Sequence, residues 1–349
     1  MKFKFLENIV GSFDWVSGDI AIDLGTANTL IWLSGRGLII NEPSIIAKST
    51  QTGKVLAVGD QAKEMLGKTH QGIETIRPLR DGVIDDFDAV YSMLDSFIKK
   101  VNLNRLRRPK IVICVPSDVT AVEKKAVKDA AEKQAAREVF LVDEPVAAAI
   151  GIGLDISKPL GNIIVDIGGG TTEVAVISLN GVVTKKAIRV AGDEMDEAII
   201  HWFRNEHKLE IGEQTAEEIK ISVGSAMRVR SKNIVVKGRD LVSGIPKTLE
   251  VRSDEVRQAL KDPVTRIVEV IKQALEDTPP QLSADIVERG IILAGGGSLL
   301  KGIDQVLREK TGVPVNVADE PHLSVVKGCG IIIENLCLLY TSPSPRDRG

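Results

Sequence analysis

The chain is poor in the residues that mark metal-binding or membrane-spanning proteins. Its three cysteines, Cys114, Cys329 and Cys337, lack the spacing of metal ligands, and two of them stand within apolar runs. Buried reduced thiols in a cytoplasmic protein are therefore expected. The four histidines are scattered and form no zinc motif. No apolar run approaches the roughly 20 residues that a helix needs to cross a bilayer.

An excess of charge of one sign is also missing. The 45 basic residues nearly balance the 48 acidic ones, and the net charge is −3. Such a chain has no general attraction to nucleic acid, and no nucleic-acid partner is expected. Its hydrophobic fraction of 43% and charged fraction of 27% are those of a soluble globular protein. At 349 residues it is long enough for two or more domains.

What the chain does contain is a glycine-rich turn that occurs twice between apolar runs. Residues 23–29 read Asp-Leu-Gly-Thr-Ala-Asn-Thr, and residues 166–173 read Asp-Ile-Gly-Gly-Gly-Thr-Thr-Glu. Each sequence predicts a hairpin of two strands. Backbone N–H groups of such a turn can bind phosphate oxygens, and the aspartate at its start, Asp23 or Asp166, can hold a hydrated Mg²⁺. Two such hairpins predict two similar domains that grip one nucleotide from both sides.

A third glycine-rich turn fits the same picture. Residues 295–298, Gly-Gly-Gly-Ser, stand between an expected strand over residues 290–294 and an expected helix over residues 299–310. The dipole at the N-terminus of such a helix favours an anion. One glycine triplet is more often a plain tight turn, but three such turns in one chain favour a ligand site.

Glu144 stands between an expected strand, residues 139–142, and a helix that contains residues 147–149. Because proline is favoured at the first helical position, Pro145 places Glu144 at or near the N-cap. Its carboxylate could be only a cap, or it could orient or deprotonate a water that attacks a γ-phosphate.

A second acidic segment begins the helix that is expected over residues 216–227. Thr215 and Glu218 have capping-box spacing, which would make Glu218 structural. Glu217 and Lys220 share one helix face, where they would pair with each other or reach a ribose.

The first thirteen residues predict a short amphipathic helix of the kind that anchors proteins at a membrane interface. The alternatives are a terminal helix packed on the protein's own core, or disorder. A second candidate membrane contact is the apolar and basic loop around Leu106. The apolar face of the N-terminal segment comprises Phe3, Leu6, Ile9, Val10 and Phe13.

The chain resembles the actin-like ATPase superfamily, and most closely its bacterial cell-shape family, MreB. The resemblance is carried by the two phosphate turns, by residues 142–145 and by residues 295–298, and it extends from residue 23 to about residue 336. It implies the α/β actin-like ATPase fold, with two duplicated ribonuclease-H-like lobes, each with a small subdomain, and a nucleotide cleft between them. The alternation of strands and helices in both halves agrees with this layout.

The resemblance also implies a division of the chain into subdomains. Subdomain IA would comprise residues 19–46, 80–158 and 325–337, and subdomain IB residues 47–79. Subdomain IIA would comprise residues 159–194 and 256–324, and subdomain IIB residues 195–255. Residues 1–18 would be the membrane anchor. Residues 338–349 depart from the family's C-terminus in their Ser, Pro and Arg content, so they are interpreted as a non-native tail.

Site residues follow from the motifs that match. Glu144 and Thr172 would be catalytic, and Asp23 and Asp166 would hold Mg²⁺ mostly through water. The ATP contacts implied for the phosphates are Thr26, Ala27, Asn28, Gly168, Gly169 and Gly170. Those implied for the adenosine are Glu217, Glu218, Ile219, Lys220, Gly295, Gly296, Gly297 and Ser298.

The function implied by the resemblance is ATP-dependent assembly of the chain with itself into filaments on the inner face of the cytoplasmic membrane. These would direct the cell-wall elongation machinery and rod shape. Hydrolysis of ATP would be slow, because a polymer switch needs both nucleotide states to last. Two alternatives share the fold. A sugar-kinase-type phosphotransferase needs a base for its substrate, and no segment offers one; a chaperone-type ATPase would carry a further substrate-binding domain.

Overall fold

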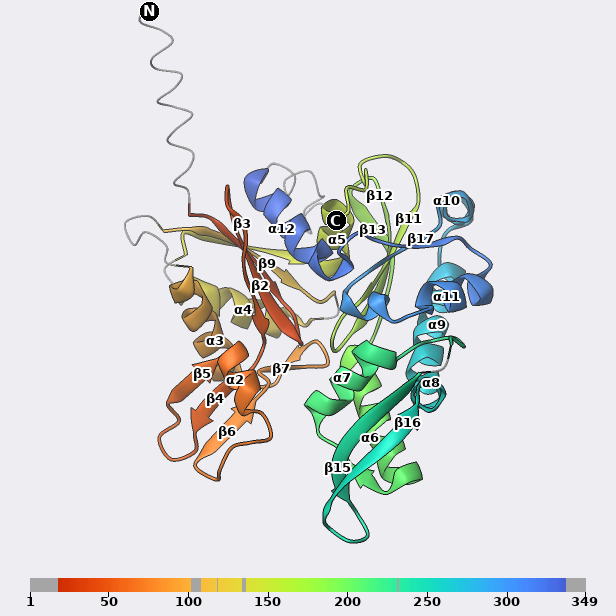
Figure 1. The fold of residues 1–349 in the computed structure, drawn as a ribbon. Helices are drawn as coiled ribbons and strands as arrows, with labels where there is room; N and C mark the ends of the chain where they lie inside the picture. Colours follow the sequence, from red (N-terminus) through yellow and green to blue (C-terminus); the bar gives the residue numbers. More distant parts are fainter. Residues whose placement is uncertain (1–17, 102–107, 118, 134–135, 231, 337–349) are drawn as a thin grey trace, which may run out of the picture.

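A computed structural model of the chain describes residues 18–101, 108–117, 119–133, 136–230 and 232–336 (Figure 1). The predicted N-terminal anchor with Phe3, Leu6, Ile9, Val10 and Phe13, the loop residue Leu106 and the 338–349 tail lie outside these ranges. Within them, no helix combines the length and the apolar character that a membrane crossing requires.

The sheet of lobe I is built around the first predicted hairpin. Its five strands lie in the order β10-β9-β1-β2-β3, in which β1 pairs antiparallel with β2 and parallel with β9. The first phosphate turn therefore joins β1 to β2. The strands are β1 (Ile20–Leu24), β2 (Asn28–Leu33), β3 (Gly37–Pro43), β9 (Lys110–Val115) and β10 (Glu138–Asp143).

The sheet of lobe II repeats this plan around the second hairpin. Its order is β13-β12-β11-β17-β18, and β11 pairs antiparallel with β12 and parallel with β17. A three-stranded meander followed by two parallel strands thus occurs in both lobes, which confirms the predicted duplication. The strands are β11 (Asn162–Ile167), β12 (Thr172–Ser178), β13 (Gly181–Ile188), β17 (Ile291–Ala294) and β18 (Val315–Val317).

Helices cover the sheets, and each lobe has an apolar core of its own. In lobe I, α3 (Phe87–Lys100) buries Met93, Leu94 and Phe97, and α4 (Ala121–Lys133) follows β9. In lobe II, α9 (Lys261–Glu276) buries seven residues at helical spacing. The other covering helices of lobe II are α10 (Pro280–Arg289) and α11 (Ile303–Thr311).

Two helices, α5 (Glu144–Gly151) and α12 (Ser324–Glu334), lie between the two sheets (Figure 1). They pack closely, because a Cβ on Gly328 would lie only 3.0 Å from Gly151 N. A third apolar cluster joins residues of these helices to both sheets. It contains Cys114 and Cys329, whose sulfur atoms are 2.9 Å apart. Both are buried free thiols, as predicted.

Each lobe also carries a smaller part on the same side of the molecule (Figure 1). In lobe I, a short ribbon of β7 (Leu79–Arg80) and β8 (Val83–Ile84) leads back to the main sheet. The smaller part of lobe I holds β4 (Ile46–Ser49), β5 (Val55–Val58), α2 (Asp60–Met65) and β6 (Ile73–Ile76). That of lobe II holds α6 (Gly192–His207), β14 (Leu209–Glu210), α7 (Glu213–Val223), β15 (Asn233–Asp240), β16 (Pro246–Arg252) and α8 (Ser253–Ala259).

Two local predictions are wrong. Helix α7 begins at Glu213 after the N-cap Gly212, so Thr215 lies inside the helix and forms no capping box with Glu218. The expected helix over residues 299–310 is divided into a short 3₁₀ helix, η2 (Gly296–Leu299), and α11. The break begins at Leu300, whose ψ of 123° is extended, and ends at Gly302, whose φ of 78° is left-handed and precedes α11.

Candidate functional site

A cavity of about 480 Å³ opens between the lobes. All three glycine-rich turns reach it, together with the first residue of α5 and one face of α7. Segments that are far apart in the sequence therefore meet at one place, as the two-sided grip predicts. The predicted site residues that line the cavity are Asp23, Thr26, Ala27, Asn28, Glu144, Asp166, Gly168, Gly169, Glu217, Lys220, Gly295, Gly296 and Gly297.

Five predicted residues do not line this cavity. Thr172 is fully buried, and its hydroxyl donates to Val190 O at 2.7 Å. Ser298 donates to Gly295 O at 2.6 Å, and Ile219 belongs to the core of lobe II. Glu218 is exposed, and Gly170 packs against Asp81.

The first and second phosphate turns touch each other across the cleft. A Cβ on Gly169 would lie 2.6 Å from Cβ of Ala27 and 3.0 Å from its N. Any side chain at residue 169 would therefore push the two turns apart, which is the physical reason for glycine there. Both turns also approach the segment around Gly82, whose N–H donates to Thr26 Oγ1 at 3.3 Å.

The third turn is held against the second hairpin. Gly295 has a φ of 77°, and its N–H donates to Pro321 O at 2.9 Å. Its Cα faces the Ile167 carbonyl and the Asp166 carboxylate so closely that no Cβ would fit. The turn can thus present backbone to a ligand in the cavity.

Several carboxylates line the cavity, among them Asp23, Asp166 and Glu144. Burial raises the pKa of Asp23, at the end of β1, to about 7. Burial, and then the charge of Asp23, raises the pKa of Asp166 to about 7 as well. Ionising these two buried acids costs free energy when no positive charge is near. A cation between them would stabilise their charged forms. No cluster of three or more potential metal ligands occurs among the described residues, and Mg²⁺ commonly takes only one or two carboxylates.

Glu144 is the first residue of α5, because the N-cap is Asp143. Pro145 is the second residue of α5, one position later than expected, and Glu144 stands beside the N-cap, as the sequence predicts. Burial raises the pKa of Glu144 well above its usual range, and the charges of Glu173, Asp23 and Asp166 raise it further. Glu144 lines the same cavity as Asp23 and Asp166.

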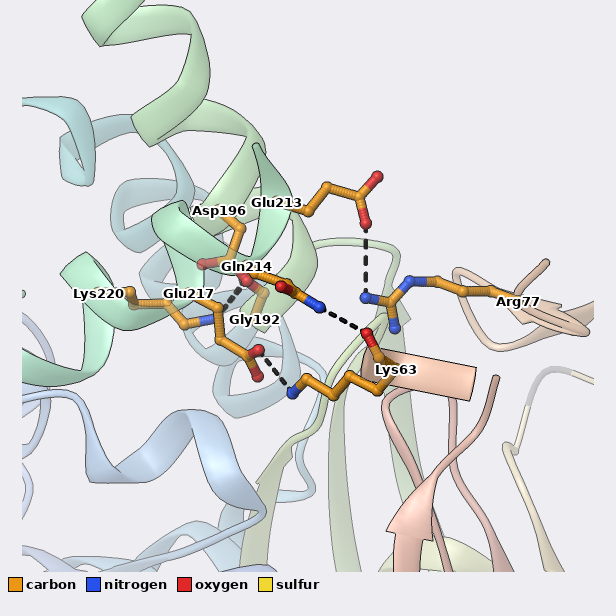
Figure 2. A network of polar contacts seen from close by, with 8 residues as sticks. All are labelled: Lys63, Arg77, Gly192, Asp196, Glu213, Gln214, Glu217 and Lys220. Atoms are coloured by element: carbon orange, nitrogen blue, oxygen red, sulfur yellow. Dashed lines mark hydrogen bonds and ion pairs between the residues drawn. The ribbon is translucent and has the colours of Figure 1, made fainter. Parts of the chain in front are cut away.

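Side chains from the two smaller parts meet between α2 and α7 (Figure 2), and this gap between the lobes is called the mouth of the cleft below. Lys63 Nζ of α2 lies 2.7 Å from Glu217 Oε2 of α7, and Gln214 Nε2 donates to Lys63 O at 2.6 Å. Arg77 Nη2 lies 3.5 Å from Glu213 Oε2. Glu217 therefore pairs across the cleft with Lys63, and not with Lys220, which was one of the two alternatives that the sequence left open; the other, contact with a ribose, stays a prediction.

Lys220 is likewise held by lobe II. Its Nζ donates to Asp196 Oδ2 at 2.7 Å and to Gly192 O at 2.8 Å (Figure 2). These contacts fix Lys220 between α6 and α7, where it also lines the cavity. Glu217 and Lys220 thus share a face of α7 and have different partners.

Sequence reasoning missed several residues that line the cavity. Thr171 lines it in place of its neighbour Thr172. The N-terminus of α6 docks on the second turn, since Gly192 N donates to Gly168 O at 3.2 Å and Asp193 N to Gly169 O at 2.8 Å. The only sequence signal for this contact is the glycine at residue 192 before a helical run.

Comparisons with known proteins agree with this architecture. The family described as MreB/Mbl protein matches residues 17–340. The chain is 50% identical over 320 residues to the cell shape-determining protein Mbl of Bacillus subtilis. This match covers 91% of this chain and 96% of Mbl. It is 49% identical over 325 residues to the cell shape-determining protein MreB of Escherichia coli, covering 91% of this chain and 94% of that protein.

Solved structures give the same result. The crystal structure of MreB5 of Spiroplasma citri bound to ADP matches with a TM-score of 0.88 and 35% identity, and covers 93% of this chain and 98% of MreB5. The MamK double helical filament matches with a TM-score of 0.78 and 23% identity, covering 91% of this chain and 99% of that one, which shows the actin-like fold alone. The chain therefore belongs to the MreB/Mbl family.

Proposed function

We propose that the chain is an ATP-binding cytoskeletal protein that assembles with itself into filaments and hydrolyses ATP slowly. The observation that carries this proposal is the contact between Ala27 and Gly169, which brings the two phosphate turns of separate lobes to one cavity. A nucleotide bound in such a site would contact both lobes, so both lobes would respond to its binding at the same time. The names of the relatives, cell shape-determining proteins, support a cytoskeletal role.

The residues at the cavity fit ATP and Mg²⁺. The turns at Thr26–Asn28 and Gly168–Gly169 would hold the phosphates, with Asp23 and Asp166 around hydrated Mg²⁺. Bound Mg²⁺ would neutralise charge on the phosphates. We propose that Thr171, and not Thr172, supplies a hydroxyl at this point, because only Thr171 lines the cavity. Solved relatives bound to ADP and to AMPPNP support nucleotide binding.

Glu144 is proposed to orient the attacking water. Its carboxylate lines the cavity that both phosphate turns share. A neighbourhood of buried acids disfavours its ionisation in the absence of a cation, and a cation beside Asp23 and Asp166 would favour it. Hydrolysis would then depend on the presence of the cation together with the nucleotide. This dependence suits a polymer switch whose two nucleotide states both last.

Assembly and location complete the proposal. We propose filaments on the inner face of the cytoplasmic membrane that work with the cell-wall elongation machinery. The N-terminal segment, with Leu106 as a second contact, would bind lipid weakly in each subunit, and a filament would sum these contacts. The four subdomains would follow the boundaries given above, with the cleft between I and II.

The proposal is tested by binding of a fluorescent ATP analogue with and without Mg²⁺. We expect Mg²⁺-dependent binding by the wild-type chain and its loss in Gly169→Val, whose side chain would separate the two turns. Gly212→Ala is the matched control, because nothing lies within 4 Å of a Cβ there. Equal binding by wild type and Gly169→Val would contradict the placement of the nucleotide.

A further inference from the structure

Glu173 is a buried acid for which the site described above has no role. It is the second residue of β12, directly after Thr172, and is 1% exposed. Because side chains alternate along a strand, Glu173 points away from the side that Thr172 buries in lobe II. Its carboxylate instead reaches lobe I, where Oε1 accepts from Ser117 N at 3.0 Å and Oε2 accepts from Ser117 Oγ at 2.8 Å.

Ser117 is bound through all of its polar groups by lobe II. Its N–H and hydroxyl donate to Glu173 of β12, and its carbonyl accepts from Lys185 Nζ of β13 at 3.1 Å. Two neighbouring strands of one lobe therefore hold a single residue of the other. Hydrogen bonds to a buried carboxylate are short, strong and directional. This contact therefore fixes the position of Ser117 relative to lobe II, which apolar contact area alone would not do.

The contact lies beside the proposed catalytic residue. Ser117 comes two residues after the end of β9, whose last residue, Val115, pairs in register with Asp143 of β10. Glu144 follows Asp143, so Ser117 and Glu144 leave neighbouring strands at the same edge of the lobe I sheet. Glu173 is also the charged neighbour with the largest effect on the pKa of Glu144.

The other end of the contact begins at the second phosphate turn. Residues 168–171 form that turn, and β12 starts at Thr172. Only one residue separates the turn from the carboxylate that holds Ser117. A displacement of the turn would therefore be carried directly into lobe I.

We propose that Glu173 is a positioning residue, which holds Ser117 and thereby fixes the sheet edge that carries Glu144 relative to the second phosphate turn. The inference rests on the ATPase activity proposed above. It assigns to the Glu173–Ser117 pair the alignment of Glu144 with bound nucleotide, in addition to a tie between lobes. A purely structural tie would change stability and ATP affinity, whereas an alignment contact changes turnover.

The test compares Glu173→Gln, Ser117→Ala, Ser117→Thr and the double variant Glu173→Gln with Ser117→Ala. Single-turnover phosphate release is measured on full-length protein with Mg-ATP. The samples are matched in the fraction of protein that pellets, so that equal amounts of assembled protein are compared. ATP affinity and Tm are measured alongside. Ser92→Ala is the control, because its hydroxyl donates to Asp88 O on the exposed side of α3. Ser117→Ala keeps the experiment informative if Glu173→Gln does not fold.

We expect Glu173→Gln to lower the rate of hydrolysis about 10- to 100-fold, the size of effect that misplacing a reacting group produces. Ser117→Ala should lower it less, and Ser117→Thr should restore it. ATP affinity should stay within about 2-fold of wild type, and the double variant should be no slower than Glu173→Gln.

Two results would overturn the inference. One is an unchanged rate in both Glu173→Gln and Ser117→Ala. The other is a loss of rate that is matched by an equal loss of ATP affinity and of Tm, which would leave only a structural tie. Failure of the proposed function would look different, since wild-type protein would then release no phosphate.

Discussion

The ammonium group of Lys63 lies 2.7 Å from the carboxylate of Glu217, and this pair joins the two lobes across the mouth of the cleft. The side chains are 35% and 37% exposed, so water and salt screen the attraction. Exposed pairs of this kind contribute about 0.2–1 kcal/mol each. A contact of that size can hold the mouth closed and still open on the time scale of nucleotide exchange.

Reversing one charge of this pair should speed release of nucleotide. In Lys63→Glu, two carboxylates would face each other, and we expect ADP to dissociate about 2- to 10-fold faster at low salt. The double variant Lys63→Glu with Glu217→Lys should restore part of the slow release. Stopped-flow displacement of a fluorescent ADP measures both. A single variant with unchanged release at low salt would show that the mouth does not limit exchange.

The buried acid Asp166 should make the nucleotide-free protein less stable as pH rises. Burial raises its pKa to about 7 in the folded chain, against 3.8 for an aspartate in water. Below about pH 4 it is protonated in both states and costs nothing, and the folded state loses stability as pH rises from there through 7. Asp166→Asn should therefore be more stable than wild type, by about 1–3 kcal/mol near pH 8 and by less near pH 5.

Thermal unfolding in a chelator at both pH values measures this difference. The same variant should lose Mg²⁺-dependent binding of ATP, because one of the two acids at the cation position is gone. Destabilisation of Asp166→Asn near pH 8 would mean that the carboxylate has a stabilising partner in the empty fold.

Loss of the Glu144 carboxylate should slow hydrolysis and spare binding. Groups that orient or deprotonate water typically contribute about 10²–10⁴-fold. Glu144→Gln should then bind ATP like wild type and form filaments that persist longer after ATP is added. Phosphate release per assembled subunit is the measurement, and an unchanged rate would reduce Glu144 to a residue of the α5 N-terminus.

Membrane attachment should require both assembly and the first sixteen residues. A chain that starts at Ser17 lacks Phe3, Leu6, Ile9, Val10 and Phe13. We expect it to form filaments but not to co-sediment with anionic vesicles. Basic residues near lipid add only about 1 kcal/mol each, so those that remain would not replace the lost apolar face. Full binding by the truncated chain would move the anchor to the loop around Leu106, and a Leu106→Ser variant then tests that loop.

Local signals in the sequence were sufficient for the framework of the fold. Both hairpins were predictable because a glycine-rich turn between two apolar runs leaves few other conformations, and the duplicated sheets follow from them. The same locality caused the errors. Thr215 and Glu218 have capping spacing, but Gly212 is the N-cap and α7 begins at Glu213, before both of them.

The role predicted for Thr172 depends on which face of its strand this residue occupies. Strand alternation allows only one of Thr171 and Thr172 to face the cavity, and the sequence does not say which. The register of β12 against β13, with Thr172 opposite Ile188, turns Thr172 into lobe II. Contacts between distant segments, such as Lys63 with Glu217 and Glu173 with Ser117, leave no trace in a single sequence, because nothing local links their partners.

Electron microscopy combined with pelleting, on purified chain with Mg-ATP, ADP or no nucleotide, tests the central claim most directly. We predict filaments with Mg-ATP, few or none without nucleotide, and none from Asp166→Ala under any condition. If the wild-type chain bound Mg-ATP at saturation and stayed monomeric at every concentration, or formed the same filaments with no nucleotide, nucleotide would not control its assembly, contrary to this prediction.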